Sequence, residues 1–229
     1  MIKPNGVHHI AIMTADIKAQ IAYFTDVLGC KLSALFDMHG VPGAFHAFVH
    51  LNDHSYFSFV QMDDIGDIPA TIGITHAGTG AGKAAAGVMQ HLAFNVDSHA
   101  DLLAMRDRIR TKGVSVMGPI DHGVCQSIYF AGPEGLTLEV ASSEGEMDPQ
   151  LWIDPKVLDR VGISPEEAER FKAPDAYSGQ GGTVAQPVSD PAKPHMAYPP
   201  EVYQALMGMP DEVLGKMISY TTPPVAAPV

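Results

Sequence analysis

Three side chains that can bind a metal ion occur at matching places in a pattern that the sequence contains twice. His9 opens the short apolar run HIAI, His91 opens the similar run HLAF, and Glu139 lies within the later apolar run LTLEV. Burying a carboxylate in such a run is unfavourable, and binding a metal ion would offset that penalty. Two imidazoles and one carboxylate form the facial set that holds non-haem iron(II) and leaves coordination positions open for a substrate and dioxygen. The spacing therefore predicts metal-dependent oxygen chemistry.

The elements that must position these residues follow the same order in both copies. In the first copy, Asp16 can cap an amphipathic helix that Gly29 ends, and in the second copy Ser98 and Gly113 have the same roles. The predicted strands are residues 7–13, 31–38, 44–51 and 55–61 in the first copy, and residues 90–96, 114–117, 126–131 and 136–141 in the second. This duplicated β-α-β-β-β order predicts an α+β fold built from two paired modules.

The modules span about residues 7–62 and 88–143, with a linker at 63–87, and together they form a predicted domain of residues 1–143. Proline then recurs throughout residues 144–229, and only short helices are expected in this C-terminal extension. We expect the extension to wrap the body or a partner subunit rather than to build a core of its own. A homodimer is therefore an open alternative to a monomer.

The linker contains the run GTGAGK at residues 78–83, which is similar to a phosphate-binding loop. A phosphate loop requires glycine six residues before the lysine and serine or threonine directly after it. Ala77 and Ala84 occupy those places, so the run is interpreted as a flexible or lid-like loop and not as a nucleotide site.

Bulk composition excludes several classes of partner. The net charge of −12 and the absence of a basic run argue against binding nucleic acid. No run of about 18 apolar residues is present, so no membrane span is expected. The beginning of the sequence lacks the apolar stretch of a signal peptide, and Cys30 and Cys125 do not indicate a disulfide scaffold. We expect a soluble cytoplasmic protein.

The duplicated order, together with His9, His91 and Glu139, resembles the vicinal oxygen chelate superfamily over residues 7–143. The resemblance implies that the two βαβββ modules form a cupped mixed sheet around one metal ion, with ligands from the first and fourth strands of each module. By register, about Phe59 takes the place in the first module that Glu139 has in the second. A missing fourth ligand counts against glyoxalase I and epimerases, and it suits extradiol dioxygenases and fosfomycin-resistance enzymes.

The residues around the ligands resemble the extradiol ring-cleaving dioxygenases in particular. Tyr129 lies ten residues before Glu139, the spacing of a tyrosine that hydrogen-bonds a substrate oxygen in that family. His122, in the run DHG, is implied to donate to oxygen or to stabilise an anionic intermediate. His54, in the run HLNDH, resembles the acid–base histidine that takes a hydroxyl proton and later returns it.

The sequence thus predicts an iron(II)-dependent extradiol dioxygenase, an oxidoreductase that cleaves a small catechol-like aromatic with O2. Manganese(II) suits the same ligands, so the metal is not decided by the sequence. One alternative is a manganese-dependent transferase of the fosfomycin-resistance kind, or another metal-dependent lyase or isomerase of the superfamily. A second alternative is a protein that sequesters an aromatic ligand without turnover, although the complete ligand set argues against it.

Overall fold

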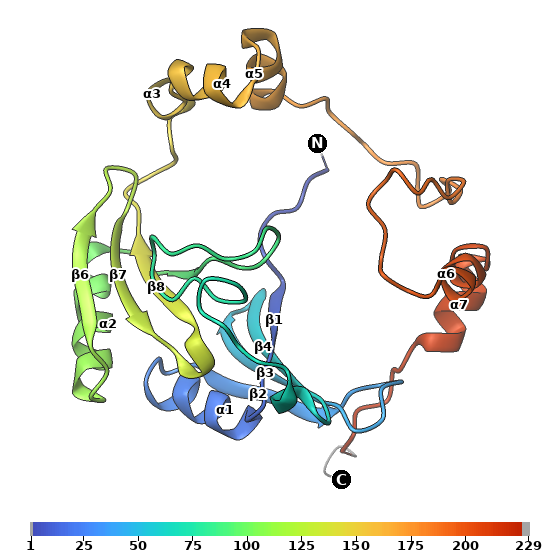
Figure 1. The fold of residues 1–229 in the computed structure, drawn as a ribbon, viewed down its shortest axis with the longest axis horizontal. Helices are drawn as coiled ribbons and strands as arrows, with labels where there is room; N and C mark the ends of the chain where they lie inside the picture. Colours follow the sequence, from blue (N-terminus) through green and yellow to red (C-terminus); the bar gives the residue numbers. More distant parts are fainter. Residues whose placement is uncertain (1, 226–229) are drawn as a thin grey trace. The chain divides into compact units, whose positions relative to one another are not determined.

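The computed structural model describes residues 2–225 and contains two compact units (Figure 1). The first unit, the body, consists of Asn5–Met38 and Gly43–Pro174. The second consists of the described parts of Met1–Pro4, His39–Pro42 and Asp175–Val229. The body therefore extends beyond residue 143, where composition placed the end of the domain.

The first module contains β1 (His9–Met13), α1 (Ile17–Asp26), β2 (Lys31–Asp37), β3 (Phe45–Asn52) and β4 (Ser55–Gln61), in the predicted order. Its sheet runs β1-β4-β3-β2, with β1 parallel to β4 and the other neighbours antiparallel. Asp16 begins α1 as predicted, because its carboxylate accepts a hydrogen bond of 2.9 Å from the Ala19 N–H.

The second module repeats this arrangement with β5 (Leu92–Asn95), α2 (His99–Thr111), β6 (Val116–Asp121), β7 (Gln126–Ala131) and β8 (Thr137–Ser142). Its sheet runs β5-β8-β7-β6, again with one parallel pair, β5 and β8. The α+β class and the paired modules are confirmed. The eight strands are hydrogen-bonded as two open four-stranded sheets and not as one continuous sheet.

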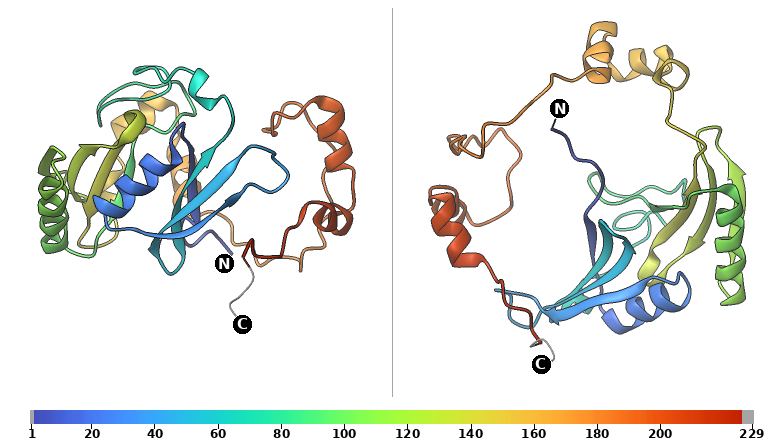
Figure 2. Two further views of the ribbon diagram at one scale, coloured as in Figure 1. Left: turned by 90° about the horizontal axis from the view of Figure 1, so that it is seen from below. Right: turned by 180° about the vertical axis from the view of Figure 1, so that it is seen from behind.

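Each sheet is covered by its own helix on one face, so that the opposite, helix-free face can carry functional groups (Figure 2). Phe24 of α1 stacks on Phe57 of β4 with ring centroids 4.8 Å apart, and Phe24 also meets Phe94 of β5 at 6.1 Å. Alternation along a strand then places neighbouring residues on the other face. One hydrophobic cluster joins both modules; its fully buried members include Phe24, Phe57, Phe59, Leu102, Ile109, Ile128 and Leu138.

Polar contacts also join the modules, at both ends of α1. At its C-terminus, Arg108 of α2 donates to the carbonyls of Val27 (2.9 Å) and Asp26 (3.0 Å), where a helix favours a cation. Lys112 adds an ion pair with the Asp26 carboxylate at 2.5 Å. These contacts hold the two helices together on the covered side of the sheets.

At the other end of α1, Glu134 from the second module contacts the first. It lies in the 3-10 turn Pro133–Gly135 between β7 and β8, and it has a left-handed φ of 54°. Its carboxylate accepts hydrogen bonds from the Thr14 hydroxyl (2.6 Å), the Ala15 N–H (2.8 Å) and the Gln20 amide (2.7 Å). Burial raises the pKa of Glu134, but the three donors stabilise the carboxylate and bring its pKa below the ordinary value.

Replacing Glu134 with glutamine is expected to lower the free energy of unfolding by about 1–3 kcal/mol near neutral pH, because hydrogen bonds to a charged acceptor are lost. Since the folded carboxyl has a depressed pKa, its contribution is complete above the ordinary carboxyl pKa and disappears as pH falls through the folded value. Urea unfolding at several pH values should therefore show the difference from wild type shrinking in acid. Glu144→Gln, at an exposed position, is the matched control; equal stability of Glu134→Gln and wild type at neutral pH would contradict this role.

The C-terminal extension is helical in both units. The body includes α3 (Pro149–Trp152), α4 (Pro155–Val161) and α5 (Pro165–Lys172), and the second unit includes α6 (Pro200–Met207) and α7 (Asp211–Ile218). Within residues 2–225, no helix combines the length and the apolar character that crossing a bilayer requires.

Candidate functional site

The helix-free face of the second sheet carries a histidine–carboxylate pair. Glu139 lies in β8, directly opposite Ala93 of β5, and only 4% of it is exposed. His91, which directly precedes β5, has its Nε2 2.9 Å from Glu139 Oε2. A buried carboxylate needs such a partner or a metal ion. The structure therefore brings together two of the three predicted metal ligands.

Tyr129 and His122 lie next to this pair. Tyr129 is the cross-strand neighbour of Glu139 on β7, and its ring centroid is 6.3 Å from that of His91. Its hydroxyl is 3.1 Å from Nε2 of His122, which follows β6 in a turn closed by the hydrogen bond from the His122 N–H to the Cys125 carbonyl. Burial raises the pKa of Tyr129, and the Glu139 charge raises it further, so the phenol is a hydrogen-bond donor at neutral pH.

His9, the third predicted ligand, lies on the other sheet. It begins β1, its Nδ1 is 3.0 Å from Nδ1 of His8, and its ring packs edge-on against Phe48 at 5.6 Å. In the described part of the chain, no three His, Cys, Asp or Glu side chains are grouped so that they could hold a metal ion. One chain thus presents two of the predicted ligands as a pair and the third separately.

The strand register corrects one detail of the sequence interpretation. Ala11 pairs with Ser58 just as Ala93 pairs with Glu139, so Ser58 and not Phe59 takes the place of the fourth ligand. Phe59 lies on the other face, in the core.

His54 is exposed in the turn between β3 and β4, where its N–H donates to the Asn52 side chain at 2.9 Å. It belongs to the first module, whereas His91, Glu139, Tyr129 and His122 belong to the second. Its acid–base role stays a prediction.

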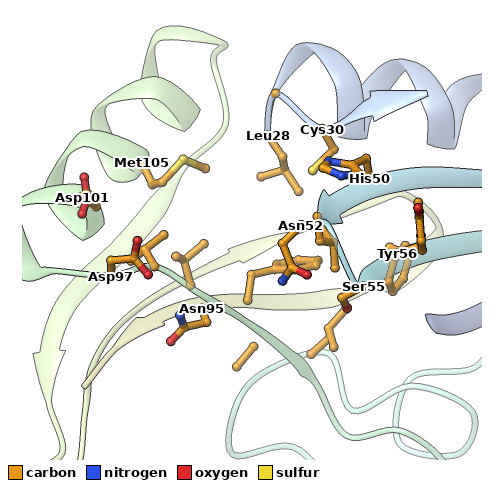
Figure 3. A pocket seen from close by; sticks show the side chains of 18 of the residues that line it. Leu28, Cys30, His50, Asn52, Ser55, Tyr56, Asn95, Asp97, Asp101 and Met105 are labelled. Carbon is orange, nitrogen blue, oxygen red and sulfur yellow. The ribbon is translucent and has the colours of Figure 1, made fainter. Parts of the chain in front are cut away.

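A pocket of about 910 Å3 lies between the two modules (Figure 3). The turn that carries His54 forms part of its wall, and residues of β5 and α2 form the opposite side. The labelled lining residues are Leu28, Cys30, His50, Asn52, Ser55, Tyr56, Asn95, Asp97, Asp101 and Met105. His91 and Glu139 are not among the residues that line it, so this pocket and the histidine–carboxylate pair are different places in the body.

Two contacts of this region were not foreseen from the sequence. Trp152 of α3 packs against Gly123, beside His122, so closely that a Cβ on Gly123 would lie 2.7 Å from the indole ring. Gln90 contacts Nδ1 of His91 through its side-chain oxygen. Neither Trp152 nor Gln90 belongs to a recognisable motif. A long-range contact such as that of Trp152 with Gly123 leaves no local signal in a single sequence.

Comparison with known proteins agrees with this architecture. Residues 6–140 match the model of the Glyoxalase/Bleomycin resistance protein/Dioxygenase superfamily, and the chain belongs to this superfamily. The resemblance stated from the sequence is thereby confirmed. Biphenyl-2,3-diol 1,2-dioxygenase 2 of Rhodococcus globerulus is 26% identical over 132 residues, which are 58% of this chain and 60% of that protein. The chain thus spans less than two thirds of the length of this relative.

A solved structure with a TM-score of 0.50 supports the same fold at low identity. A glyoxylase/bleomycin resistance protein/dioxygenase domain from Frankia sp. EAN1pec is 16% identical with a TM-score of 0.50, covering 62% of this chain and all of that one (100%). The fosfomycin resistance protein FosX of Listeria monocytogenes is 18% identical with a TM-score of 0.41, covering 64% of this chain and 97% of its own. At 16% identity, the likeness to the Frankia domain concerns the fold and not the activity.

Proposed function

We propose that this protein is an iron(II)-dependent extradiol dioxygenase that cleaves a catechol-like aromatic ring with O2. The observation that carries the proposal is the grouping of His91, Glu139, Tyr129 and His122 on one sheet face, with the histidine and carboxylate paired at 2.9 Å. The relationship to biphenyl-2,3-diol 1,2-dioxygenase 2, at 26% identity, supports the same reaction class.

The donor set fits iron(II), because an imidazole nitrogen and a carboxylate oxygen already face each other at the pair. Bound iron(II) would supply adjacent open positions for the two substrate oxygens and for dioxygen. In the reaction one ring C–C bond beside the hydroxyl pair breaks, and both oxygen atoms of O2 enter the product.

The residues beside the pair would handle the substrate. The Tyr129 phenol, which keeps its proton at neutral pH, can donate to one substrate oxygen and orient the ring. His122, within hydrogen-bond distance of that phenol, can donate to negative charge that develops on oxygen. His54 is proposed as the base that takes the second hydroxyl proton.

His9 is proposed as the third ligand, supplied by a second copy of the chain. It lies on the helix-free face of the first sheet, whereas His91 and Glu139 lie on that of the second. Each of the two faces also exposes an apolar side chain. Met13 on the first sheet is 45% exposed to solvent, and Met117 on the second sheet is 60% exposed. In a two-fold dimer, each chain can present its first sheet to the second sheet of its partner, which would complete two equal sites.

Oxygen uptake by the iron-loaded protein with a panel of catechols tests this function. We expect stoichiometric O2 consumption and a yellow ring-opened product with at least one catechol. Tyr129→Phe should retain iron but lower kcat/KM by about 10–100-fold, since one oriented hydrogen bond is lost. Tyr203→Phe, the same change outside the proposed site, should behave as wild type. Metal binding without O2 uptake for any catechol would refute the proposal and favour transfer or isomerisation.

A further inference from the structure

Gln90 is the residue through which the linker and the proposed ligand His91 are connected. Its side-chain nitrogen donates to two backbone carbonyls of the linker, those of Thr79 (3.0 Å) and Gly82 (3.1 Å). Its side-chain oxygen contacts Nδ1 of His91. The half-buried Gln90 amide thus contacts the linker through its nitrogen and His91 through its oxygen.

These contacts also determine which atoms of His91 carry hydrogen. Carbonyl oxygens only accept, so the end of the Gln90 amide that faces Thr79 and Gly82 must be the NH2 group. The opposite end is then an acceptor, and the His91 Nδ1 that meets it must carry a hydrogen. In the neutral ring this leaves the lone pair on Nε2, the atom that faces Glu139.

The linker segment held by Gln90, residues 78–82, is called here the glycine loop, and it lies against the proposed site. A Cβ on Gly80 would lie 3.4 Å from the Tyr129 ring, so the loop backbone lies beside the phenol that is proposed to orient substrate. At Gly82 a Cβ would lie 2.0 Å from the Ala77 carbonyl oxygen, and the loop therefore needs glycine there. The loop is a closely packed turn beside the site.

We infer that Gln90 is a positioning residue that couples the glycine loop to His91. It holds the imidazole with Nε2 directed at Glu139, and it holds the glycine loop against Tyr129 as a wall of the substrate site. The substrate part of this role rests on the proposed function. The coupling itself depends only on the contacts of Gln90 with His91, Thr79 and Gly82.

Two substitutions distinguish the contact of Gln90 with the linker from its contact with His91. Gln90→Glu keeps an oxygen that can accept from His91, as carboxylates beside metal-binding histidines do. It replaces the NH2 group with an acceptor that repels the two linker carbonyls. Gln90→Met removes both contacts at similar size. Gln150→Met, at an exposed position, is the matched control.

The readouts are hydrogen exchange of the linker in the metal-free protein and the affinity for manganese(II) alone. Gln90→Glu should speed exchange across residues 77–87 by about tenfold or more and leave manganese affinity within about tenfold of wild type. Gln90→Met should release the glycine loop and also weaken manganese binding by about 10–100-fold. If the Met variant does not fold, the Glu variant still decides the coupling from exchange and manganese binding.

Linker exchange at the wild-type rate in Gln90→Glu, or wild-type manganese affinity in a folded Gln90→Met, would overturn the inference. Neither readout requires catalysis. Absence of O2 uptake with catechols would therefore remove the proposed function while leaving the position of Gln90 between His91 and the glycine loop open to its own test.

Discussion

Replacing Glu139 with glutamine is expected to abolish turnover, with kcat/KM falling by at least about a thousandfold, and to remove most metal binding. The carboxylate is buried and faces His91 Nε2 at 2.9 Å, so the amide would offer a neutral oxygen where a charged ligand is needed. A thousandfold loss corresponds to several kcal/mol of charge stabilisation, the scale of a metal centre's contribution. The measurement is O2 uptake together with metal content of the purified variant.

The glutamine side chain of Glu139→Gln has nearly the same shape as the glutamate that it replaces, so the variant should keep the fold. Far-UV circular dichroism is expected to match wild type, and Glu146→Gln, at an exposed position, should keep full activity. A folded Glu139→Gln protein that retains both metal and turnover would show that Glu139 is a structural partner of His91 and not a ligand.

Mixing two inactive variants is expected to restore activity. His9→Ala and His91→Ala homodimers should each be inactive, because each lacks one ligand in every site. When the two chains are mixed and allowed to exchange, half of the dimers contain one chain of each kind, and one of the two sites in such a dimer has all its ligands. Activity should therefore return to roughly a quarter of the wild-type level.

The control is a mixture of His91→Ala with Glu139→Gln. Both changes affect the second sheet, so neither chain of the mixed dimer offers a complete His91–Glu139 pair and activity should stay at background. If the His9→Ala and His91→Ala mixture is also inactive after chain exchange has been verified by mass spectrometry, His9 does not act across a dimer.

Local patterns predicted the strands of the second module, and the family resemblance named the residues that these strands bring together. The run LTLEV predicted a buried strand for Glu139, whereas Tyr129 was named through the family resemblance. The register shows Tyr129 as the cross-strand neighbour of Glu139. His122 follows the adjoining strand in a turn, so a hairpin brings it to the same place. These relations follow from strand alternation and turn length, both of which are visible in a sequence.

Local sequence patterns could not predict how the two modules pack against each other. How His9 lies with respect to His91 depends on how the two sheets pack. Contacts such as those of Glu134 with Gln20 and of Arg108 with Val27 determine that packing. A register error of one residue exchanged the faces of Ser58 and Phe59, because side chains alternate with a period of two. The contacts of Gln90 depend on the path that the linker follows. The linker is irregular, and no periodic sequence pattern predicts its path.

Anaerobic titration of the metal-free protein with iron(II), read by native mass spectrometry, tests the central claim most directly, because one spectrum reports both metal and chain number. The expected result is a dimer that takes up one iron per chain, with most of this uptake lost in Glu139→Gln and in His9→Ala. A protein that binds no iron, or one whose iron uptake is unchanged in Glu139→Gln, would contradict a metal centre at His91 and Glu139.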